Sequence, residues 1–172
     1  MAEPPTPPTP AAPTPRSRSV RVPRELGRYR SVVTFTVVRE GEPADRERMD
    51  TPEASARWAR SVIADDDREH FWVALLDSQN RLLASHHVST GSLSASVVHP
   101  REVLKPALLV AAAHLILAHN HPSGDPTPSK EDVHLTRQLV EGARLLGLRI
   151  HDHLIIGSGH PDYVSLATRG LI

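Results

Sequence analysis

Two histidines and an aspartate lie close together in this chain, and their side chains are of the types that bind metal ions. His119 and His121 end the apolar run "LILAHNH", and Asp132 follows the loop "PSGDPTPSKE". Side chains two residues apart on a β-strand point to the same side, so both imidazoles are expected to face one point. Two imidazole nitrogens and one carboxylate oxygen can hold a catalytic Zn²⁺ and leave a fourth position for water, whose pKa the ion lowers to about 7. The pattern therefore indicates hydrolytic metal chemistry.

The same residues also have simpler explanations. Ser129 and Asp132 fit a capping box, in which a Ser or Thr and an acidic side chain three residues later close the first turn of a helix. The chain has 11 histidines, so a His-x-His triplet can arise by chance. From residue types and spacing alone, a metal site and a plain helix cap both stay open.

Composition narrows the chemistry. The chain has no cysteine, which excludes disulfides, thiolate nucleophiles and thiolate zinc sites, so any metal ligand must be His, Asp or Glu. Lys plus Arg and Asp plus Glu number 20 each, so no overall field draws the protein toward nucleic acid or acidic lipid. No apolar run reaches the ~18 residues of a membrane span, and the first residues do not resemble a secretory signal. We therefore expect a cytoplasmic protein without a membrane segment.

The first part of the chain is unsuited to building a core. Residues 1–30 hold 8 of the 16 prolines and 6 arginines, with few apolar side chains to offset the entropy of ordering. We expect a disordered Pro/Arg-rich tail over residues 1–28 and one domain over residues 29–172, with a motif-bearing core over residues 51–172. A solubilising role for the tail is favoured over contact with nucleic acid or an acidic partner.

Residue patterns predict the order of the elements that must position the three ligands. The predicted strands cover residues 31–40, 115–119, 148–157 and 162–167, together with a hairpin over residues 70–91. The predicted helices cover residues 50–64 with Asp50 as N-cap, residues 99–114 with a bend near Pro106, and residues 129–147 from the cap Ser129 to Gly147. The apolar side of the last helix is expected to contain Val133, Leu135, Leu139, Leu145 and Leu146. This order predicts an α/β (α+β) fold in which helices flank a mixed β-sheet.

The spacing His119-x-His121-x₇-Ser129-x₂-Asp132 matches the JAMM signature of JAB/MPN metalloprotease-like domains. The wider segments "VHPREV", "LTRQLVEGARLLGL" and "DHLIIG" resemble the RadC family, and the resemblance covers about residues 51–172. It implies a JAB/MPN, cytidine-deaminase-like layered fold. It also implies that His119, His121 and Asp132 bind zinc.

The resemblance implies further roles around the ion. Ser129 would hydrogen-bond the oxyanion of the tetrahedral intermediate, and an upstream glutamate would act as general base on the zinc-bound water. Glu69 in "DDDREHFW" is the candidate for this base, with Glu102 in "HPREV" as the alternative. Asp152 and His153 are candidates to orient a metal ligand, although a packing role explains them equally well.

These features favour a zinc-dependent hydrolase of JAMM type, a metallopeptidase that cleaves a peptide or isopeptide bond in a peptide or protein substrate. The alternative is a non-catalytic zinc-containing RadC-like module in DNA repair or mobile-element biology. Full-length RadC-like proteins carry an N-terminal helix-hairpin-helix region, and this chain has a Pro/Arg tail instead. We therefore expect no direct nucleic-acid binding and predict no nucleic-acid-binding residue.

Overall fold

The computed structural model describes residues 46–63, 67–91, 98–159 and 162–172. The tail predicted over residues 1–28 and the strand predicted over residues 31–40 lie outside the described residues.

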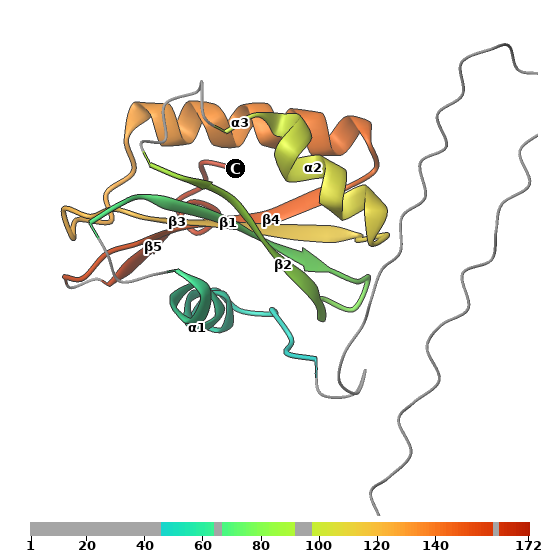
Figure 1. The fold of residues 1–172 in the computed structure, drawn as a ribbon, viewed down its shortest axis with the longest axis horizontal. Coiled ribbons are helices and arrows are strands. Elements are labelled where there is room, and N and C mark those ends of the chain that lie inside the picture. The colour runs from blue at the N-terminus through green and yellow to red at the C-terminus, as the bar shows by residue number, and fades with distance from the viewer. Residues whose placement is uncertain (1–45, 64–66, 92–97, 160–161) are drawn as a thin grey trace, which may run out of the picture. The chain divides into compact units, whose positions relative to one another are not determined.

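The centre of the domain is a five-stranded sheet with the strand order β2-β1-β3-β4-β5 (Figure 1). Strand β1 (His70–Leu76) pairs antiparallel with β2 (Leu82–Thr90) on one side and with β3 (His114–Asn120) on the other. Strand β3 pairs parallel with β4 (Arg149–Ile156), and β5 (Tyr163–Ser165) pairs antiparallel with β4. The predicted mixed sheet is therefore confirmed.

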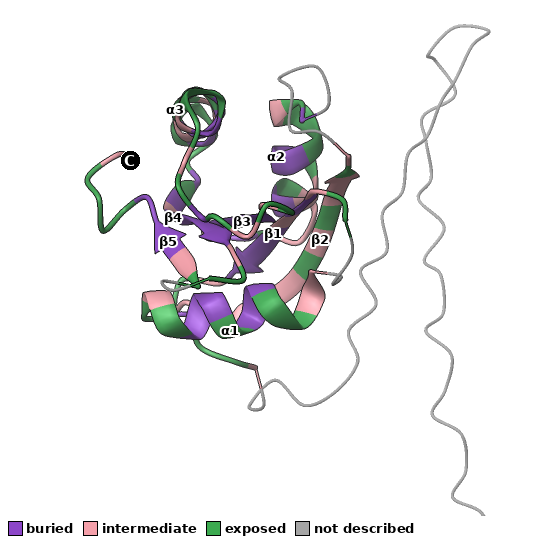
Figure 2. Cartoon of the chain, turned by 90° about the vertical axis from the view of Figure 1, so that its left-hand side faces the viewer, coloured by how far each residue is buried: buried purple, intermediate pink, exposed green. Residues whose placement is uncertain are grey.

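Helices cover both faces of this sheet. Helix α1 (Pro52–Val62) lies on one face, and α2 (Pro100–Leu109) and α3 (Lys130–Leu145) lie on the other (Figures 1 and 2). Parallel strands need a crossover connection, and α3 supplies it between β3 and β4. No helix within the described ranges combines the length and hydropathy needed to cross a membrane.

The two layers of helices explain why β1 reads as a continuous apolar run. Phe71, Val73 and Leu75 belong to the core beneath α2 and α3, whereas Ala74 and Leu76 belong to the core against α1. All five side chains are buried. Each large apolar side chain buried in this way stabilises the fold by about 1.5–3 kcal/mol. The ligand-bearing strand β3, at the centre of the sheet, therefore lies beside a strand that is buried on both faces.

Two predicted helix ends differ from the structure. Thr51, and not Asp50, is the N-cap of α1, because its Oγ1 accepts a hydrogen bond from the Ala54 N–H at 3.2 Å. Asp50 instead pairs with Arg48 at 2.7 Å. Helix α2 ends at Leu109, five residues before the predicted end at residue 114, because the chain must already be extended at His114 to pair with β1.

Leu145 and Leu146 were predicted to lie on the apolar side of α3, and this prediction is wrong. Their exposed fractions are 88% and 47%, while Leu135 and Leu139 are buried as predicted. A helix turns by about 100° per residue, so Leu145 lies about 120° around the helix from Leu139. Leu146 is the C-cap residue and lies beyond the helix. Both side chains therefore point away from the sheet.

The loop between β3 and α3 is fixed against the end of β4. The Ser158 and Gly159 N–H groups donate to the Gly124 carbonyl at 3.1 and 3.3 Å. A Cβ at Gly157 would lie 2.8 Å from Cδ of Pro126, which is closer than packed atoms tolerate. A Cβ at Gly159 would lie 3.6 Å from the Gly124 oxygen, an ordinary contact. The absence of a side chain at Gly157 therefore allows this loop to approach β4.

We predict that Gly157→Ala lowers the free energy of unfolding by about 1–3 kcal/mol, because either the loop or β4 must move. The matched variant Gly159→Ala should stay within about 0.5 kcal/mol of the wild type. Urea unfolding of both variants tests this. Equal stability of the two variants would show that the close approach at Gly157 does not constrain the loop.

Candidate metal centre

The three predicted ligands converge where β3 ends and α3 begins. Their ligand atoms all lie within 4.8 Å of one another. Nε2 of His119 is 3.1 Å from Nε2 of His121. Oδ1 of Asp132 is 3.4 Å from His119 Nε2, and Oδ2 is 3.4 Å from His121 Nε2. The structure thus brings together the residues that the sequence singled out.

These separations fit a single ion. Ligand atoms placed ~2.0–2.1 Å from zinc at the tetrahedral angle are about 3.3 Å apart, close to the observed distances of 3.1 and 3.4 Å. The His119 side chain is fully buried, whereas 15% of the His121 side chain is exposed, so the group of ligands opens to solvent on the His121 side. The donor set therefore suits an ion with one coordination position left for a small molecule.

The backbone stays extended for one residue past the end of β3. This extension is what puts the side chains of His119 and His121 on the same side. Asn120 is in register with Ile156 of β4, and the His121 N–H donates to the Ile156 carbonyl at 2.9 Å. The chain then turns, because the Gly124 N–H donates to the His121 carbonyl at 2.9 Å. Gly124 has a φ of +83°, a conformation that favours glycine.

A backbone carbonyl orients the second histidine. Nδ1 of His121 lies 2.7 Å from the Asp125 carbonyl oxygen, which can only accept a hydrogen bond. Nδ1 therefore carries a proton, and Nε2 faces the other two ligands. The loop that returns the chain to α3 thus also sets the direction in which His121 can bind an ion.

A buried chain of hydrogen bonds orients the first histidine. Oγ1 of Thr136 lies 2.6 Å from the Asp132 carbonyl oxygen and 2.6 Å from Nδ1 of His153. The carbonyl can only accept, so the single hydroxyl proton goes to it, and Nδ1 of His153 must carry its own proton. Nε2 of His153 is then bare and accepts from Nδ1 of His119 at 2.8 Å. Nε2 of His119 therefore carries no proton, and its lone pair faces Asp132.

Burial keeps both inner histidines neutral. It lowers the pKa of His153 to about 4. Burial, followed by the neighbouring His153, also holds the pKa of His119 well below its usual value. A neutral imidazole is the form that binds a metal ion, so His119 offers its nitrogen lone pair throughout the physiological pH range.

Asp132 satisfies both explanations that the sequence left open. Its Oδ2 accepts from the Ser129 N–H at 2.7 Å and the Ser129 hydroxyl accepts from the Asp132 N–H at 3.1 Å, which completes the capping box. The same carboxylate faces both histidines. Burial opposes its ionisation, but hydrogen bonds with His121 and Ser129 and the neighbouring His119 hold the pKa of Asp132 well below its usual range. The cap therefore holds an ionised ligand in place.

Ser129 lies beside this group, and its hydroxyl is already engaged. Oγ donates to Asp132 Oδ2 at 2.7 Å, so the single hydroxyl proton points at the carboxylate. Donation to a substrate oxygen would require the hydroxyl to rotate. The oxyanion role of Ser129 stays a prediction.

Of the two candidate bases, only Glu69 lies next to the ligands. Phe71 of β1 pairs with His119 of β3, and Glu69 precedes Phe71 by two residues. The side chain of Asn120, between the two histidines, hydrogen-bonds to the backbone of Arg68 and His70, which flank Glu69. The Glu69 charge also contributes to raising the pKa of His121. Glu102 instead lies on the exposed surface of α2, where it pairs with Arg101 at 3.1 Å and Lys105 at 3.8 Å. Its placement does not bring it to the ligands.

Asp152 and His153, adjacent in sequence, have different surroundings. His153 contacts the ligand His119, as described above. The Asp152 carboxylate accepts from the Ser165 hydroxyl at 2.6 Å and the Ala167 N–H at 3.0 Å, so it fixes the segment after β5. Burial raises the pKa of Asp152. Toward the centre, Asp152 accepts a hydrogen bond from the backbone N–H of His153 at 2.7 Å.

The sequence argument missed Thr136 and the Asp125 carbonyl. Thr136 lies one helical turn after Asp132, on the same face of α3, and a polar residue at that buried position was a signal that could have been used. The Asp125 carbonyl carries no side-chain signal, because any residue presents a backbone oxygen.

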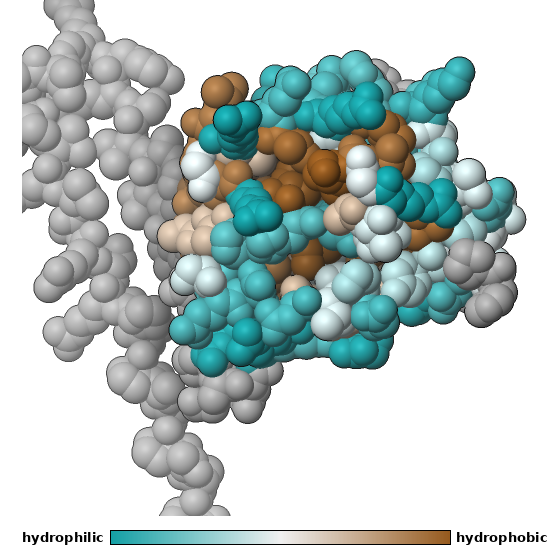
Figure 3. Space-filling model, turned by 180° about the vertical axis from the view of Figure 1, so that it is seen from behind, coloured by the Kyte–Doolittle hydropathy of each residue, from teal (hydrophilic) through white to brown (hydrophobic). Residues whose placement is uncertain are grey.

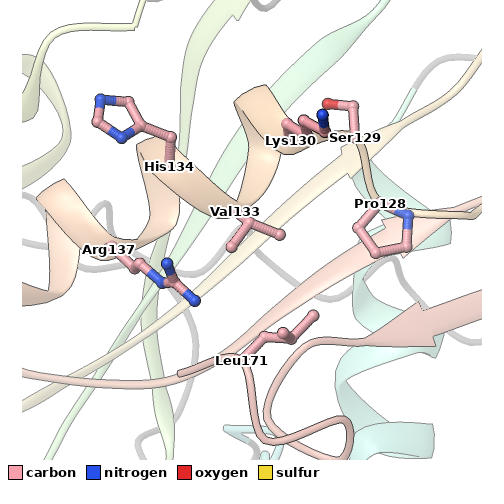
Figure 4. A pocket seen from close by; sticks show the side chains of 7 residues that line it. All are labelled: Pro128, Ser129, Lys130, Val133, His134, Arg137 and Leu171. Carbon is pink, nitrogen blue, oxygen red and sulfur yellow. The ribbon is translucent and has the colours of Figure 1, made fainter.

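A shallow hollow flanks the start of α3. It has a volume of about 360 Å³ and is lined by Pro128, Ser129, Lys130, Val133, Arg137 and Leu171, among others. The Arg137 side chain points from the helix toward Leu171 (Figure 4). Seen from behind, the domain gathers apolar side chains on one face and surrounds them with hydrophilic ones (Figure 3). The lining of the hollow itself combines apolar Pro128, Val133 and Leu171 with basic Lys130 and Arg137.

Comparisons with known proteins agree with the motif. A family model described as a RadC-like JAB domain matches residues 49–171, which include all three ligands. A UPF0758 protein of Syntrophomonas wolfei is 49% identical over 123 residues, 72% of this chain and 52% of the relative. A UPF0758 protein of Desulforudis audaxviator is 44% identical over 156 residues, which are 91% of this chain and 64% of the relative. A UPF0758 protein of Methanosarcina acetivorans is 53% identical over 110 residues, which are 64% of this chain and 47% of the relative. The chain spans about half to two thirds of the length of these relatives.

We predict that metal binding displaces a proton from His121. The hydrogen bond to Asp132, opposed by burial, raises the pKa of His121 above its ordinary 6.5. An ion must compete with this proton, so the dissociation constant for zinc should rise about tenfold per pH unit as the pH falls below that pKa. It should level off above that pKa. Competition against a chelator across this range measures the slope, and a dissociation constant independent of pH would contradict the displacement.

We predict that His153→Phe weakens zinc binding about 10–100-fold, because His119 loses the partner that fixes its orientation. His151→Phe is the matched control, since His151 lies on the same strand but contacts Asn80 at 3.1 Å. The control should bind zinc as the wild type does. Equal zinc affinity of His153→Phe and the control would show that the buried chain does not orient His119.

Proposed function

This chain belongs to the RadC-like JAB domain family, and on that premise we propose that it is a zinc-dependent hydrolase of JAMM type that cleaves a peptide or isopeptide bond. The observation that supports the proposal most is the convergence of two imidazole Nε2 atoms and an ionised carboxylate beside the segment that carries Glu69. The absence of cysteine, which suits a reducing compartment, supports a cytoplasmic location.

His119, His121 and Asp132 would hold the ion. Nitrogen and oxygen ligands with tetrahedral spacing suit zinc. When bound there, zinc supplies a Lewis acid that polarises water and the substrate carbonyl. The protein contributes the fixed direction of the two Nε2 atoms, which the Asp125 carbonyl and His153 impose.

Glu69 carries the proton transfers in this proposal. Its carboxylate takes a proton from the attacking water while the oxygen adds to the carbonyl carbon. It then returns the proton to the leaving nitrogen as the C–N bond breaks, so that a carboxylic acid and an amine result and Glu69 is regenerated. Ser129, after rotation of its hydroxyl away from Asp132, would donate to the oxygen that becomes negative.

The hollow at the start of α3 supports a peptide or protein substrate. It includes Ser129, beside the ligands, and its lining combines Lys130 and Arg137 with apolar Pro128, Val133 and Leu171. A substrate segment that reaches this hollow would be favoured by apolar and acidic side chains. Such a segment would extend from the bond that is cleaved, along the flank of α3.

We predict that Glu69→Gln retains zinc but lowers the cleavage rate about 10²–10⁴-fold, because the amide cannot accept the proton. Glu102→Gln, the matched control on α2, should retain both zinc and activity. The assay uses a library of internally quenched peptides with zinc-loaded protein, with and without a chelator.

Two outcomes would contradict parts of this account. If Glu102→Gln loses activity and Glu69→Gln does not, the assignment of the base is wrong. If fully zinc-loaded wild type cleaves no peptide, the protein is better described as a non-catalytic zinc-containing module in DNA repair or mobile-element biology.

A further inference from the structure

We propose that Asn120, between the two histidine ligands, is a positioning residue whose side-chain amide holds the Glu69 segment in register with the metal centre. Its catalytic consequence rests on the proposed function, whereas the contact itself can be tested without any substrate.

The side-chain amide of Asn120 hydrogen-bonds to the backbone on both sides of Glu69. Its Nδ2 donates to the Arg68 carbonyl at 2.9 Å, and its Oδ1 accepts from the His70 N–H at 2.7 Å. The two backbone partners fix which end of the amide is oxygen and which is nitrogen. Asn120 is buried, so water competes little with either hydrogen bond.

The two hydrogen bonds of the Asn120 amide lie just beyond the last backbone pair of β1 and β3. That pairing ends at Phe71 and His119. Continued in register, it would place Arg68 opposite Pro122, which has no N–H to donate. The His121 N–H is donated to Ile156 of β4. The side chain of Asn120 therefore extends the hydrogen bonding between β1 and β3 past the end of their backbone pairing.

The segment is also held from its other side. The Gly91 N–H donates to the Glu69 carbonyl at 2.9 Å, and the Thr90 hydroxyl lies 3.3 Å from His70 Nδ1. The peptide groups around Glu69 are thus fixed between the end of β2 and the amide on β3. The general base and the ligands then move as one unit.

This coupling matters because proton transfer depends steeply on distance. A general base must lie within hydrogen-bonding reach of the proton that it takes, and a misplacement of about 1 Å can cost about 10²-fold in rate. Because Asn120 lies between His119 and His121, its amide ties the backbone around Glu69 to the two histidine ligands.

The test measures hydrogen exchange of individual backbone amides by NMR in the full chain. Asn120→Ala should speed exchange of the His70 amide about tenfold, because it loses its acceptor, while amides in the middle of β1 keep wild-type rates. Asn120→Asp keeps the oxygen for His70 but not the donor to Arg68, so it should retain protection of the His70 amide. Ser85→Ala is the control: it removes the acceptor of the Trp58 indole N–H, far from Glu69, and should leave His70 unchanged.

If the His70 amide of Asn120→Ala exchanges at the wild-type rate, the proposed role of Asn120 is wrong. It is also wrong if exchange speeds up equally for all amides of β1. If peptide cleavage is found, Asn120→Ala should lower kcat with little change in zinc affinity. It should cost nothing further in the Glu69→Gln background, and additive losses would overturn the link to Glu69. If no cleavage is found, the proposed hydrolase function is wrong. Hydrogen exchange still tests whether Asn120 holds the backbone around Glu69.

Discussion

Two bare imidazole nitrogens held 3.1 Å apart repel each other unless a proton or a cation lies between them. Nδ1 of each ring is already committed, in His121 to the Asp125 carbonyl and in His119 to His153. Neither ring can relieve the contact by turning without losing a hydrogen bond. In the free protein the Asp132 carboxylate raises the pKa of His121 and so favours a proton on its Nε2. A divalent cation meets this constraint better, because it satisfies all three groups at once.

Much of the architecture serves to hold this unfavourable arrangement together. Asp132 caps α3 and closes the ligand set with one carboxylate, so the stability of the helix start and the geometry of the centre depend on the same side chain. The βαβ crossover places β4 beside β3. His153 on β4 accepts a hydrogen bond from Nδ1 of His119 and so fixes the orientation of that ligand. The contact of Gly157 with the loop and the Asn120 amide extend this support to the loop and to Glu69.

The sequence predicted the sheet from β-branched runs and apolar periodicity. The His-x-His spacing and the Ser-x-x-Asp helix start left a metal site and a plain helix cap both open, and the resemblance to the JAMM signature implied that His119, His121 and Asp132 are ligands. The structure brings these three residues together in a group that could hold a metal ion. The predictions were wrong at the ends of helices. Thr51, and not Asp50, is the N-cap of α1, and Asp50 pairs with Arg48 instead. Leu145, in the last turn of α3, lies on the side of the helix that faces away from the sheet. Thr136 left one unused signal in the sequence, a polar residue on the buried face of α3. The contacts of Thr136 with His153 and of Asn120 with Arg68 and His70 join segments distant in sequence, and spacing alone does not reveal them.

The most direct test is anomalous diffraction at the zinc edge from crystals of the purified, zinc-loaded protein. The account predicts one peak per chain, bonded to Nε2 of His119, Nε2 of His121 and a carboxylate oxygen of Asp132, with both Nδ1 atoms still hydrogen-bonded as described. The absence of a peak at these three residues, or coordination through Nδ1 of either histidine, would contradict it.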